Sequence, residues 1–475
     1  MSADASAIPK GDASEVAGSF RDPDGRVFRI GNKLYRAIHE RGLEHITLLH
    51  SSGLYEELTS RSLLIPHAEA TERIARLSGA PRVIEPQLIP FVSQPYEWCF
   101  SQLRDAAKCT LRVQTIALEK SMILADASAF NIQFHRGSPL LMDTLSLKSW
   151  DKHRPWDGYR QFCEHFLGPM ALTHYRGVDA SCFLQVWMEG IPLRIVSRLL
   201  PVRSWLNPGM LIHIHLHSLA QQRVKAPVPQ ASQRRTSTGT NAVKGLALSL
   251  LSAVESMRPK LGTSAWSAYY EKGVAGNEVY QKHKEGTVKE MFNLAQPQSA
   301  WDLGANTGNF SLLAAAHGIQ TVAFDSDAAC VERMYQKVRT SHITSLLPLV
   351  MNVAAPSPSI GWNLHERLSF FQRGTPDMAI ALALIHHLCI AHNIPLKQLP
   401  RFFAKLAPWS IVEFVPKSDP MTQLMLASRE DIFPDYTVEE FEALFSERFS
   451  IRKKVCLKES QRMVYLIERK DSSTP

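Results

Sequence analysis

Two short stretches of the sequence contain residue types that suit ligand binding: WDLGANTGNF, residues 301–310, and TVAFDSD, residues 321–327. Gly304 and Gly308 allow a tight turn and let the backbone approach a ligand that a Cβ would block. Residues 299–303 are predicted to form a short buried strand, and the residues from Phe310 a helix whose first amides face the ligand. Taken alone, two glycines at this spacing are equally compatible with an ordinary structural turn.

The acids beside these glycines narrow the type of ligand. Asp325 ends a second predicted strand about twenty residues after the first glycine, where an acid can accept hydrogen bonds from both ribose hydroxyls. The G-x-x-x-G spacing differs from the G-x-G-x-x-G of a dinucleotide site, and no Gly-Lys-Ser/Thr follows to form a P-loop. Asp302 adds a negative charge where a cationic group can sit, and Asn306 between the glycines joins these candidate cofactor-binding residues. A ligand that combines a ribose, an adenine and a cationic amino-acid tail is S-adenosylmethionine.

This arrangement resembles the class I S-adenosylmethionine-dependent methyltransferases, whose first motif reads acidic-x-G-x-x-x-G and whose next strand closes on an acid. The residues at matching places are Asp302, Gly304, Gly308 and Asp325. The resemblance covers residues 266–470 and implies that Asn352, after the third strand, lies near the adenine. It also implies an α/β fold with a doubly wound, Rossmann-like sheet, closed by an antiparallel pair over residues 449–457 and 462–469.

Three residues are candidates for catalysis. His386 and His387 follow the predicted fourth strand, PDMAIALALIHHL, at the carboxyl edge where ligands bind in such sheets. Either imidazole could act as a general base toward an acceptor hydroxyl, although each could equally serve only in packing. Glu413 closes the fifth strand, where it can orient a histidine or the acceptor, or lie at the surface as a solvated acid.

The fourth strand lacks the Asn/Asp-Pro-Pro-aromatic signature that holds a planar exocyclic amine. We therefore expect a small-molecule or saccharide acceptor, methylated on oxygen or carbon, rather than an adenine or a glutamine amide. The formal charge of +8 is weak evidence for a nucleic-acid partner, and we expect none.

The N-terminal half contains a second candidate site in LADASAFNIQFHRGSPLLMD, with Asp126, Asn131 and Asp143. Four residues separate Asp126 from Asn131, and Asp143 follows twelve residues after Asn131. Protein kinases and aminoglycoside phosphotransferases use this arrangement, with the first Asp near the acceptor hydroxyl and the Asn and second Asp on magnesium. The sequence departs from that pattern because it has no Gly-rich phosphate loop, no histidine before Asp126 and no identifiable ATP lysine. The alternative is that Asp126 and Asn131 only cap local turns. We predict an α+β domain that resembles a kinase-like lobe.

Motifs in both halves, DPDGRVF, PYEW, DASAFNIQF and MDTLS followed by LALIHHL, EFVPKSDP and REDIFPDY, resemble bacterial NoeA-type proteins. These are methyltransferase-like proteins associated with nodulation. The resemblance covers nearly the whole chain and implies a methyltransferase domain joined to a second domain, which we expect to recognise or present a carbohydrate or polyketide-like acceptor.

The 475 residues exceed one ordinary core, so we predict two domains. We expect a disordered leader over residues 1–18, an N-terminal domain over 19–220, a flexible Pro- and Ser-rich linker over 221–243, and a methyltransferase domain over 244–475.

Seven scattered cysteines without a C-x-x-C pair, no secretory signal and no long apolar run indicate a cytoplasmic protein with reduced thiols and no membrane segment. The stretch HIHLH, His213 to His217, alternates like a strand, but it has no nearby carboxylate or cysteine, and we expect no metal. Two alternatives to methyl transfer stay open: phosphotransfer by the N-terminal domain, and a scaffold in which both nucleotide folds are inactive.

Overall fold

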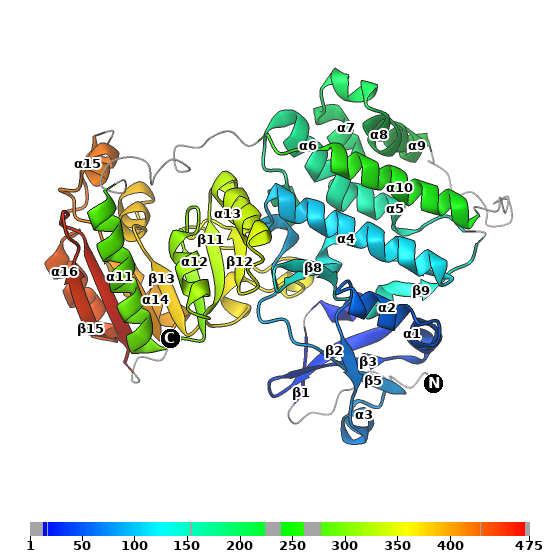
Figure 1. Cartoon of the computed structure of the whole chain (residues 1–475), viewed down its shortest axis with the longest axis horizontal. Helices are drawn as coiled ribbons and strands as arrows, with labels where there is room; N and C mark the ends of the chain where they lie inside the picture. The colour runs from blue at the N-terminus through cyan, green and yellow to red at the C-terminus, as the bar shows by residue number, and fades with distance from the viewer. Residues whose placement is uncertain are drawn as a thin grey trace. The chain divides into compact units, whose positions relative to one another are not determined.

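The computed structural model describes residues 13–16, 18–152, 154–223, 239–260, 277–427 and 429–470. The chain divides into two compact units (Figure 1). The N-terminal unit comprises Met1–Leu261 together with Ser359–Leu368, and the C-terminal unit comprises Gly262–Pro358 together with Ser369–Pro475. Within the described ranges, no helix combines the length and the hydrophobicity that crossing a bilayer requires.

The N-terminal unit begins with an antiparallel sheet whose strand order is β1-β2-β3-β5-β4. Its strands are β1 (Ala13–Glu15), β2 (Gly25–Ile30), β3 (Lys33–Ile38), β4 (His67–Glu69) and β5 (Arg82–Pro86). Strands β2 and β3 form a hairpin around the Gly31-Asn32 turn, where Gly31 has a positive φ of 57°. The short helices α1 (Glu40–Ser51), α2 (Leu54–Ser60) and α3 (Glu72–Ser78) lie between these strands in the chain.

A long helix and two small strand pairs follow. Helix α4 (Phe100–Glu119) has apolar residues at helical spacing, and most of its residues are buried. Strand β6 (Met122–Leu124) pairs with β9 (Leu147–Ser149), and β7 (Ile132–His135) forms a hairpin with β8 (Ser138–Leu141). Asp126 and Asn131 therefore lie in the turn between β6 and β7, and Asp143 lies just after β8.

The remainder of this unit is helical. Helices α5 (Gly158–Phe162) and α6 (Gly168–Arg176) are continuous through a π-helical segment, Cys163–Leu167, and α7 (Leu193–Leu199) follows. Helices α8 (Pro208–Met210) and α9 (His217–Arg223) flank a second π-helical segment, Leu211–Leu216. HIHLH is thus helical rather than a strand. Its histidines therefore take part in packing between helices. His213, for example, forms hydrogen bonds of 2.9 Å each with the hydroxyls of Tyr159 and Ser249.

The structure divides the chain later than the predicted boundary at residue 244. Helix α10 (Thr240–Ser256) lies along α4 in the N-terminal unit, and its buried face is apolar at helical spacing: Val243, Ala247, Leu250, Ala253 and Val254. Ion pairs Lys244–Glu119 (2.8 Å) and Lys108–Glu255 (3.0 Å) join the same two helices. A helix with such a face needs an apolar partner, and α4 supplies it.

Two other predicted segments can be compared only in part. Residues 13–15 of the expected leader form β1, and residues 1–12 lie outside the described residues. Within the expected linker, residues 221–223 end α9 and residues 240–243 begin α10, while 224–238 lie outside the described residues.

The C-terminal unit is built on a seven-stranded sheet with the order β12-β11-β10-β13-β14-β16-β15. Its parallel strands are β10 (Ser299–Leu303), β11 (Gln320–Asp325), β12 (Leu346–Val350), β13 (Met378–Ala381) and β14 (Trp409–Phe414). Strand β16 (Met463–Arg469) pairs antiparallel with both β14 and β15 (Phe449–Cys456). The doubly wound sheet with its closing antiparallel pair is therefore confirmed, and β10 has the predicted bounds.

Helices cover both faces of this sheet. One face carries α11 (Glu278–Ala295), α12 (Asn309–Ala316) and α13 (Ala328–Thr340) over a largely aliphatic core that includes Ala300, Ile380 and Ile411 together with Phe292 and Phe310. The other face is more aromatic, with ring contacts Trp301–Phe324, Phe403–Phe445 and Phe414–Phe441. Phe403 and Phe441 belong to α14 (Leu399–Leu406) and α16 (Val438–Arg448), while α15 (Pro420–Leu426) follows β14.

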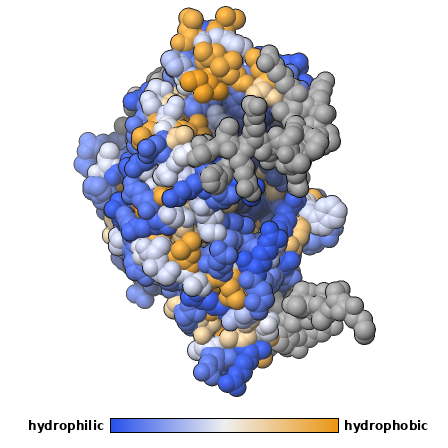
Figure 2. All heavy atoms as spheres, turned by 90° about the vertical axis from the view of Figure 1, so that its right-hand side faces the viewer, coloured by the Kyte–Doolittle hydropathy of each residue, from blue (hydrophilic) through white to orange (hydrophobic). Residues whose placement is uncertain are grey.

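The surface of the N-terminal unit has an apolar area at the end where α7 and α8 lie (Figure 2). The exposed large apolar side chains of residues 199–219 are Leu199, Val202, Trp205, Leu206, Ile212, Leu216 and Leu219. Exposed apolar side chains that gather in this way are typical of association surfaces.

The packing of α10 on α4 predicts a position-dependent effect of truncating its leucines. Leu250 is fully buried, whereas Leu248 is 52% exposed. We expect Leu250→Ala to destabilise the N-terminal unit by about 2–5 kcal/mol, and Leu248→Ala to change its stability by less than about 0.5 kcal/mol. Hydrogen exchange measured by mass spectrometry should show lost protection in α4 and α10 for Leu250→Ala alone. Equal loss in both variants would contradict this placement of α10.

Candidate functional site

The loop between β10 and α12 is shaped by residues with positive φ. Gly304 and Gly308 have φ values of 72° and 83°, and Asn306 between them has a φ of 53°. A Cβ added to Gly308 would lie 2.7 Å from Cγ and Sδ of Met334, and one added to Gly304 would lie 3.0 Å from Cδ1 of Leu384. Both glycines are therefore required by backbone conformation and by close packing.

The carboxylate of Asp325 joins this loop to the end of β11. One oxygen accepts the backbone N–H of Asn306 at 2.7 Å, and the other accepts the backbone N–H of Asp327 at 2.8 Å. Burial raises the pKa of Asp325, while these backbone N–H groups act in the opposite direction. Each carboxylate oxygen has a second lone pair, so Asp325 can still accept hydrogen bonds from a ligand.

Asp302 lies near the end of β10 and is 3% exposed. The hydroxyl of Ser311, on α12, donates to its carboxylate at 2.5 Å. Burial raises the pKa of Asp302 to about 7, and the negative charge of Asp325 acts in the same direction. The carboxyl group of Asp302 is therefore partly protonated near neutral pH.

The candidate residues come together at one edge of the sheet. Asp302, Asp325 and Asn352 lie at or just after the carboxyl ends of β10, β11 and β12, which are neighbouring parallel strands. Asn352 is exposed, and its side-chain oxygen accepts the backbone N–H of Ala354 at 2.9 Å. Ligands bind outside the carboxyl ends of strands in such sheets, so the structure places these residues where a ligand is expected.

His386 and His387 follow β13 at the same edge, with ring centroids 4.2 Å apart. Burial lowers the pKa of His387 to about 4. The pKa of His386 is well below its ordinary value because the ring is buried and His387, Arg462 and Lys284 lie near it. Within the described part of the chain, Nδ1 of His386 has no hydrogen-bond partner. Both rings are neutral at pH 7 and can accept a proton.

Glu413, at the end of β14, is fully buried instead of lying at the surface. Its carboxylate accepts hydrogen bonds from the Tyr280 hydroxyl at 2.8 Å and from Nζ of Lys284 at 2.6 Å. Nη1 of Arg462 lies 3.8 Å away. The two cations lower the pKa of Glu413 despite its burial. Glu413 is therefore ionised. Tyr280 and Lys284 of α11, together with Arg462, hold its carboxylate in place.

Sequence reasoning missed the cations around Glu413. Arg462 is 1% exposed and binds Asp419 with two hydrogen bonds, of 2.8 and 3.1 Å. Lys284 is 5% exposed, and Nζ lies 5.0 Å above the ring of Phe310. We call Lys284, Glu413, Asp419 and Arg462 the buried ion network. The available signal was weak: Tyr280 and Lys284 share one helix face at i, i+4, and Arg462 directly precedes the apolar strand β16.

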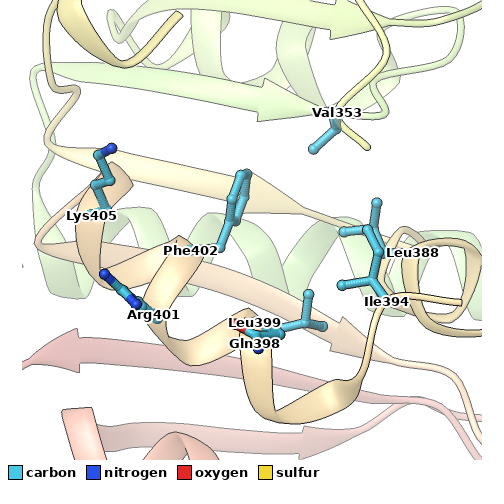
Figure 3. Close-up of a pocket in the computed structure, with 8 residues that line it drawn as sticks. All are labelled: Val353, Leu388, Ile394, Gln398, Leu399, Arg401, Phe402 and Lys405. Atoms are coloured by element: carbon cyan, nitrogen blue, oxygen red, sulfur yellow. The ribbon is translucent and has the colours of Figure 1, made fainter. Parts of the chain in front are cut away.

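A cavity of about 390 Å³ lies beside this edge of the sheet. Figure 3 shows Val353 facing α14 across it, with Leu388 and Ile394 toward one end and Arg401 and Lys405 toward the other. Val353 follows Asn352 and Leu388 follows His387 in the chain, which links the cavity to the candidate residues. Its walls are largely apolar with two cations at one end.

The N-terminal candidates Asp126, Asn131 and Asp143 also come together. The hydroxyl of Ser146 donates to Asp143 at 2.5 Å, and the amide of Asn131 donates to Ser146 at 3.2 Å. Asp126 is close enough to Asp143 that, after burial, the charge of Asp143 raises the pKa of Asp126. The turn-capping alternative is present for Asp126, which accepts the backbone N–H of Ser128, whereas the side chain of Asn131 donates to the backbone oxygen of Asp126 at 3.5 Å and to Ser146. Asp143 also caps a turn, because it accepts the backbone N–H of Leu145.

A cation on β3, which sequence reasoning did not identify, completes this group. Arg36 forms ion pairs of 2.5 Å with Asp143 and with Asp22. Protein kinases have a lysine on the third strand of the N-terminal lobe. Nothing local in the sequence links Arg36 to Asp143.

No group of three or more His, Cys, Asp or Glu side chains suitable for holding a metal occurs among the residues that the structure describes.

The strand order, the glycine loop and the acids at the carboxyl edge define the class of the C-terminal unit: it has the Rossmann-like fold of the class I methyltransferases. The whole chain is 32% identical over 467 residues to the nodulation protein NoeA of Rhizobium meliloti (strain 1021), and the match covers 96% of each chain. The protein belongs to the family of nodulation protein NoeA, which confirms the predicted resemblance. No protein-family model matches the sequence.

Solved structures are more distant. WbdD, crystallised with the kinase inhibitor LY294002, is 20% identical with a TM-score of 0.31 over 42% of this chain and 43% of WbdD. Magnesium protoporphyrin IX methyltransferase (ChlM) from Synechocystis PCC 6803 with bound SAH is 17% identical, with a TM-score of 0.32 over 43% of this chain and 93% of that chain. Because these scores are low, we assign the fold from the strand order.

The buried ion network predicts a large effect of removing Glu413. Glu413→Ala leaves Lys284 and Arg462 buried with less compensating charge, and we expect it to reduce the free energy of unfolding by about 3–5 kcal/mol at pH 7. Asp431, in an exposed pair with Lys417, is the control, and Asp431→Ala should cost less than about 1 kcal/mol. Urea unfolding followed by circular dichroism provides the measurement.

The effect of Glu413 should also depend on pH. Its pKa is lower in the folded protein, so its contribution is fully present above the unfolded pKa of about 4.3 and is lost as the pH falls through the lower folded value. The difference between wild type and Glu413→Ala should therefore persist from about pH 5 to 8 and shrink below about pH 4. A difference that stays constant into acid would contradict the ionised state of Glu413.

Proposed function

We propose that the protein is an S-adenosylmethionine-dependent methyltransferase acting on a small-molecule or saccharide acceptor, at oxygen or carbon. The observation that carries this proposal is Asp325, which ends β11 and is hydrogen-bonded to the loop that contains Gly304 and Gly308. This combination provides an acceptor for ribose hydroxyls beside a backbone that a ligand can approach closely, without a pyrophosphate cradle.

Each cofactor-binding candidate has a distinct role in this proposal. Asp325 accepts the ribose hydroxyls, Asn352 lies on the adenine side, and the carboxylate of Asp302 attracts the cationic amino group. Asn306 and the two glycines keep the loop in its tight conformation through their positive φ values. When bound, the cofactor supplies a methyl group on a positively charged sulfur, which the acceptor atom attacks in line. The protein then contributes mainly by orienting the acceptor.

We further propose that His387 or His386 accepts the acceptor proton. Both rings are neutral at pH 7, but their lowered pKa values make them weak bases, so the carbon or oxygen acceptor must itself be acidic or lose its proton late. Glu413 acts indirectly: it balances Lys284 and Arg462, whose charges help to keep His386 neutral.

The cavity lined by Val353, Leu388 and Phe402 is our candidate for the acceptor site. Its apolar wall and the cations of Arg401 and Lys405 suit an acceptor that combines an apolar surface with a negative charge. A second candidate function, phosphotransfer by the N-terminal unit, is favoured by the joining of Asn131 and Asp143 through Ser146 near Asp126.

Calorimetric titration with S-adenosylmethionine tests the role of Asp325. Asp325→Asn keeps the size of the side chain but removes its charge and one acceptor oxygen. We expect the Kd to rise by more than tenfold, about 1.4 kcal/mol. Glu447→Gln, an exposed acid of the same unit, should leave the Kd unchanged. An unchanged Kd in Asp325→Asn would exclude the ribose role, and no binding by folded wild-type protein would exclude the cofactor.

The pKa of Asp302 predicts how cofactor binding depends on pH. A cationic ligand favours the ionised carboxylate, so binding should release a proton where Asp302 is protonated in the free protein. Because that pKa is about 7, the association constant should rise with pH from about 5.5 to about 7, by up to tenfold per unit. Asp302→Asn should weaken binding and remove this dependence. A pH-independent affinity in the wild type would contradict the role of Asp302.

A further inference from the structure

A segment of the C-terminal half of the sequence folds as part of the N-terminal unit. Residues Ser359–Leu368, which we call the strap, lie between β12 and β13 in the chain but belong to the N-terminal unit. The base of the strap is closed by two backbone hydrogen bonds between Ile360 and Arg367, of 3.0 and 3.2 Å. The strap is therefore a small hairpin with Arg367 at its base.

Glu366 anchors the strap within the N-terminal unit. Its side chain is 5% exposed and accepts hydrogen bonds from Arg21, with distances of 2.9 and 3.0 Å to the two oxygens. The same carboxylate accepts the backbone N–H of Trp362 at 3.0 Å. Gly18 is required opposite the strap, because a Cβ there would lie 2.6 Å from the backbone oxygen of Glu366. These contacts fix the position of the neighbouring Arg367.

Arg367 lies over the turn that contains the N-terminal candidates. Its guanidinium carbon is 4.5 Å from the ring centroid of Phe130, a residue that lies between Asp126 and Asn131 in the sequence. Burial lowers the pKa of Arg367, whereas the charges of Glu366 and Asp126 act against this. Nε of Arg367 is buried and has no hydrogen-bond partner among the residues that the structure describes. A buried donor of this kind is costly unless a ligand or water accepts its hydrogen bond.

The positive charge of Arg367 is less fully balanced than that of Arg36, the cation on β3. Residues 126–131, Asp-Ala-Ser-Ala-Phe-Asn, include no cation. Arg36, the buried cation on β3, has both terminal nitrogens in ion pairs with Asp22 and Asp143, which balance its charge, although its Nε, like that of Arg367, has no partner among the described residues. An anionic ligand beside Asp126 therefore meets a positive charge that comes from the strap.

We propose that Arg367 binds the phosphate group of a ligand held between Asp126, Asn131 and the strap. Guanidinium groups bind phosphate oxygens through paired N–H donors, and the unused Nε–H together with one terminal nitrogen provides such a fork. The phosphate belongs either to a nucleoside triphosphate with magnesium or to a phosphorylated saccharide. Either source makes the strap, encoded within the methyltransferase half, a functional part of the N-terminal site.

Calorimetry on the full chain tests this proposal, with Mg-ATP and glucose 6-phosphate titrated separately into the wild type, Arg367→Gln and Arg367→Lys. We expect saturable binding of one ligand to the wild type, at least tenfold weaker binding to Arg367→Gln, and an intermediate Kd for Arg367→Lys, which keeps the charge but loses the fork. If only Mg-ATP binds, the phosphate belongs to a nucleoside triphosphate. If only glucose 6-phosphate binds, the phosphate belongs to a phosphorylated saccharide.

Two controls separate this proposal from a general loss of structure and from the proposed methyl transfer. Arg198→Gln, an exposed arginine on α7, should bind like the wild type. Titration with S-adenosylmethionine should give the same result in every variant, whether or not that cofactor binds. The proposal is overturned if neither phosphate ligand binds the wild type at concentrations up to about 10 mM, which corresponds to roughly 3 kcal/mol of binding free energy. Equal affinity of Arg367→Gln and the wild type would also overturn it.

Discussion

Four charged side chains that barely contact water connect four elements at the carboxyl edge of the large sheet. Lys284 comes from α11, Glu413 from β14, Asp419 from the residue before α15, and Arg462 from the residue before β16. Removing such charges from water is unfavourable by several kcal/mol per ion, and only close pairing with good hydrogen-bond geometry offsets it. Their formal charges cancel, and their distances of 2.6 to 3.8 Å leave little freedom in how the elements meet. The network thus fixes the edge at which the candidate site lies.

The same network contributes to the electrostatic conditions of that site. Lys284 and Arg462 favour neutral His386, and Lys284 also favours the ionised form of Asp302. At Asp302, burial acts more strongly than the charge of Lys284, so the pKa of Asp302 is nevertheless raised to about 7. Burial therefore sets both pKa values, and the buried cations add to its effect on His386, while Lys284 opposes its effect on Asp302.

The sequence predicted the parts of the fold that depend on local patterns. The apolar run ending at Leu303 and the glycines of the loop are signals within a few residues, and both appear where they were expected. Pairings between distant residues could not be predicted in this way, because nothing local links Lys284 to Glu413 or Arg36 to Asp143. The location of α10 was missed for a related reason. Its apolar face indicates that it packs on something, but not that the partner is α4.

The strap has a consequence for how the polypeptide must be synthesised and divided. Because the N-terminal unit includes Ser359–Leu368, a nascent chain that has emerged only as far as Leu261 lacks Glu366, the partner of buried contacts with Arg21 and the backbone near Gly18. That unit completes itself only after β10, β11 and β12 have been translated. No single cut in the chain therefore separates the two units. The N-terminal unit can finish folding only after part of the C-terminal unit has been synthesised.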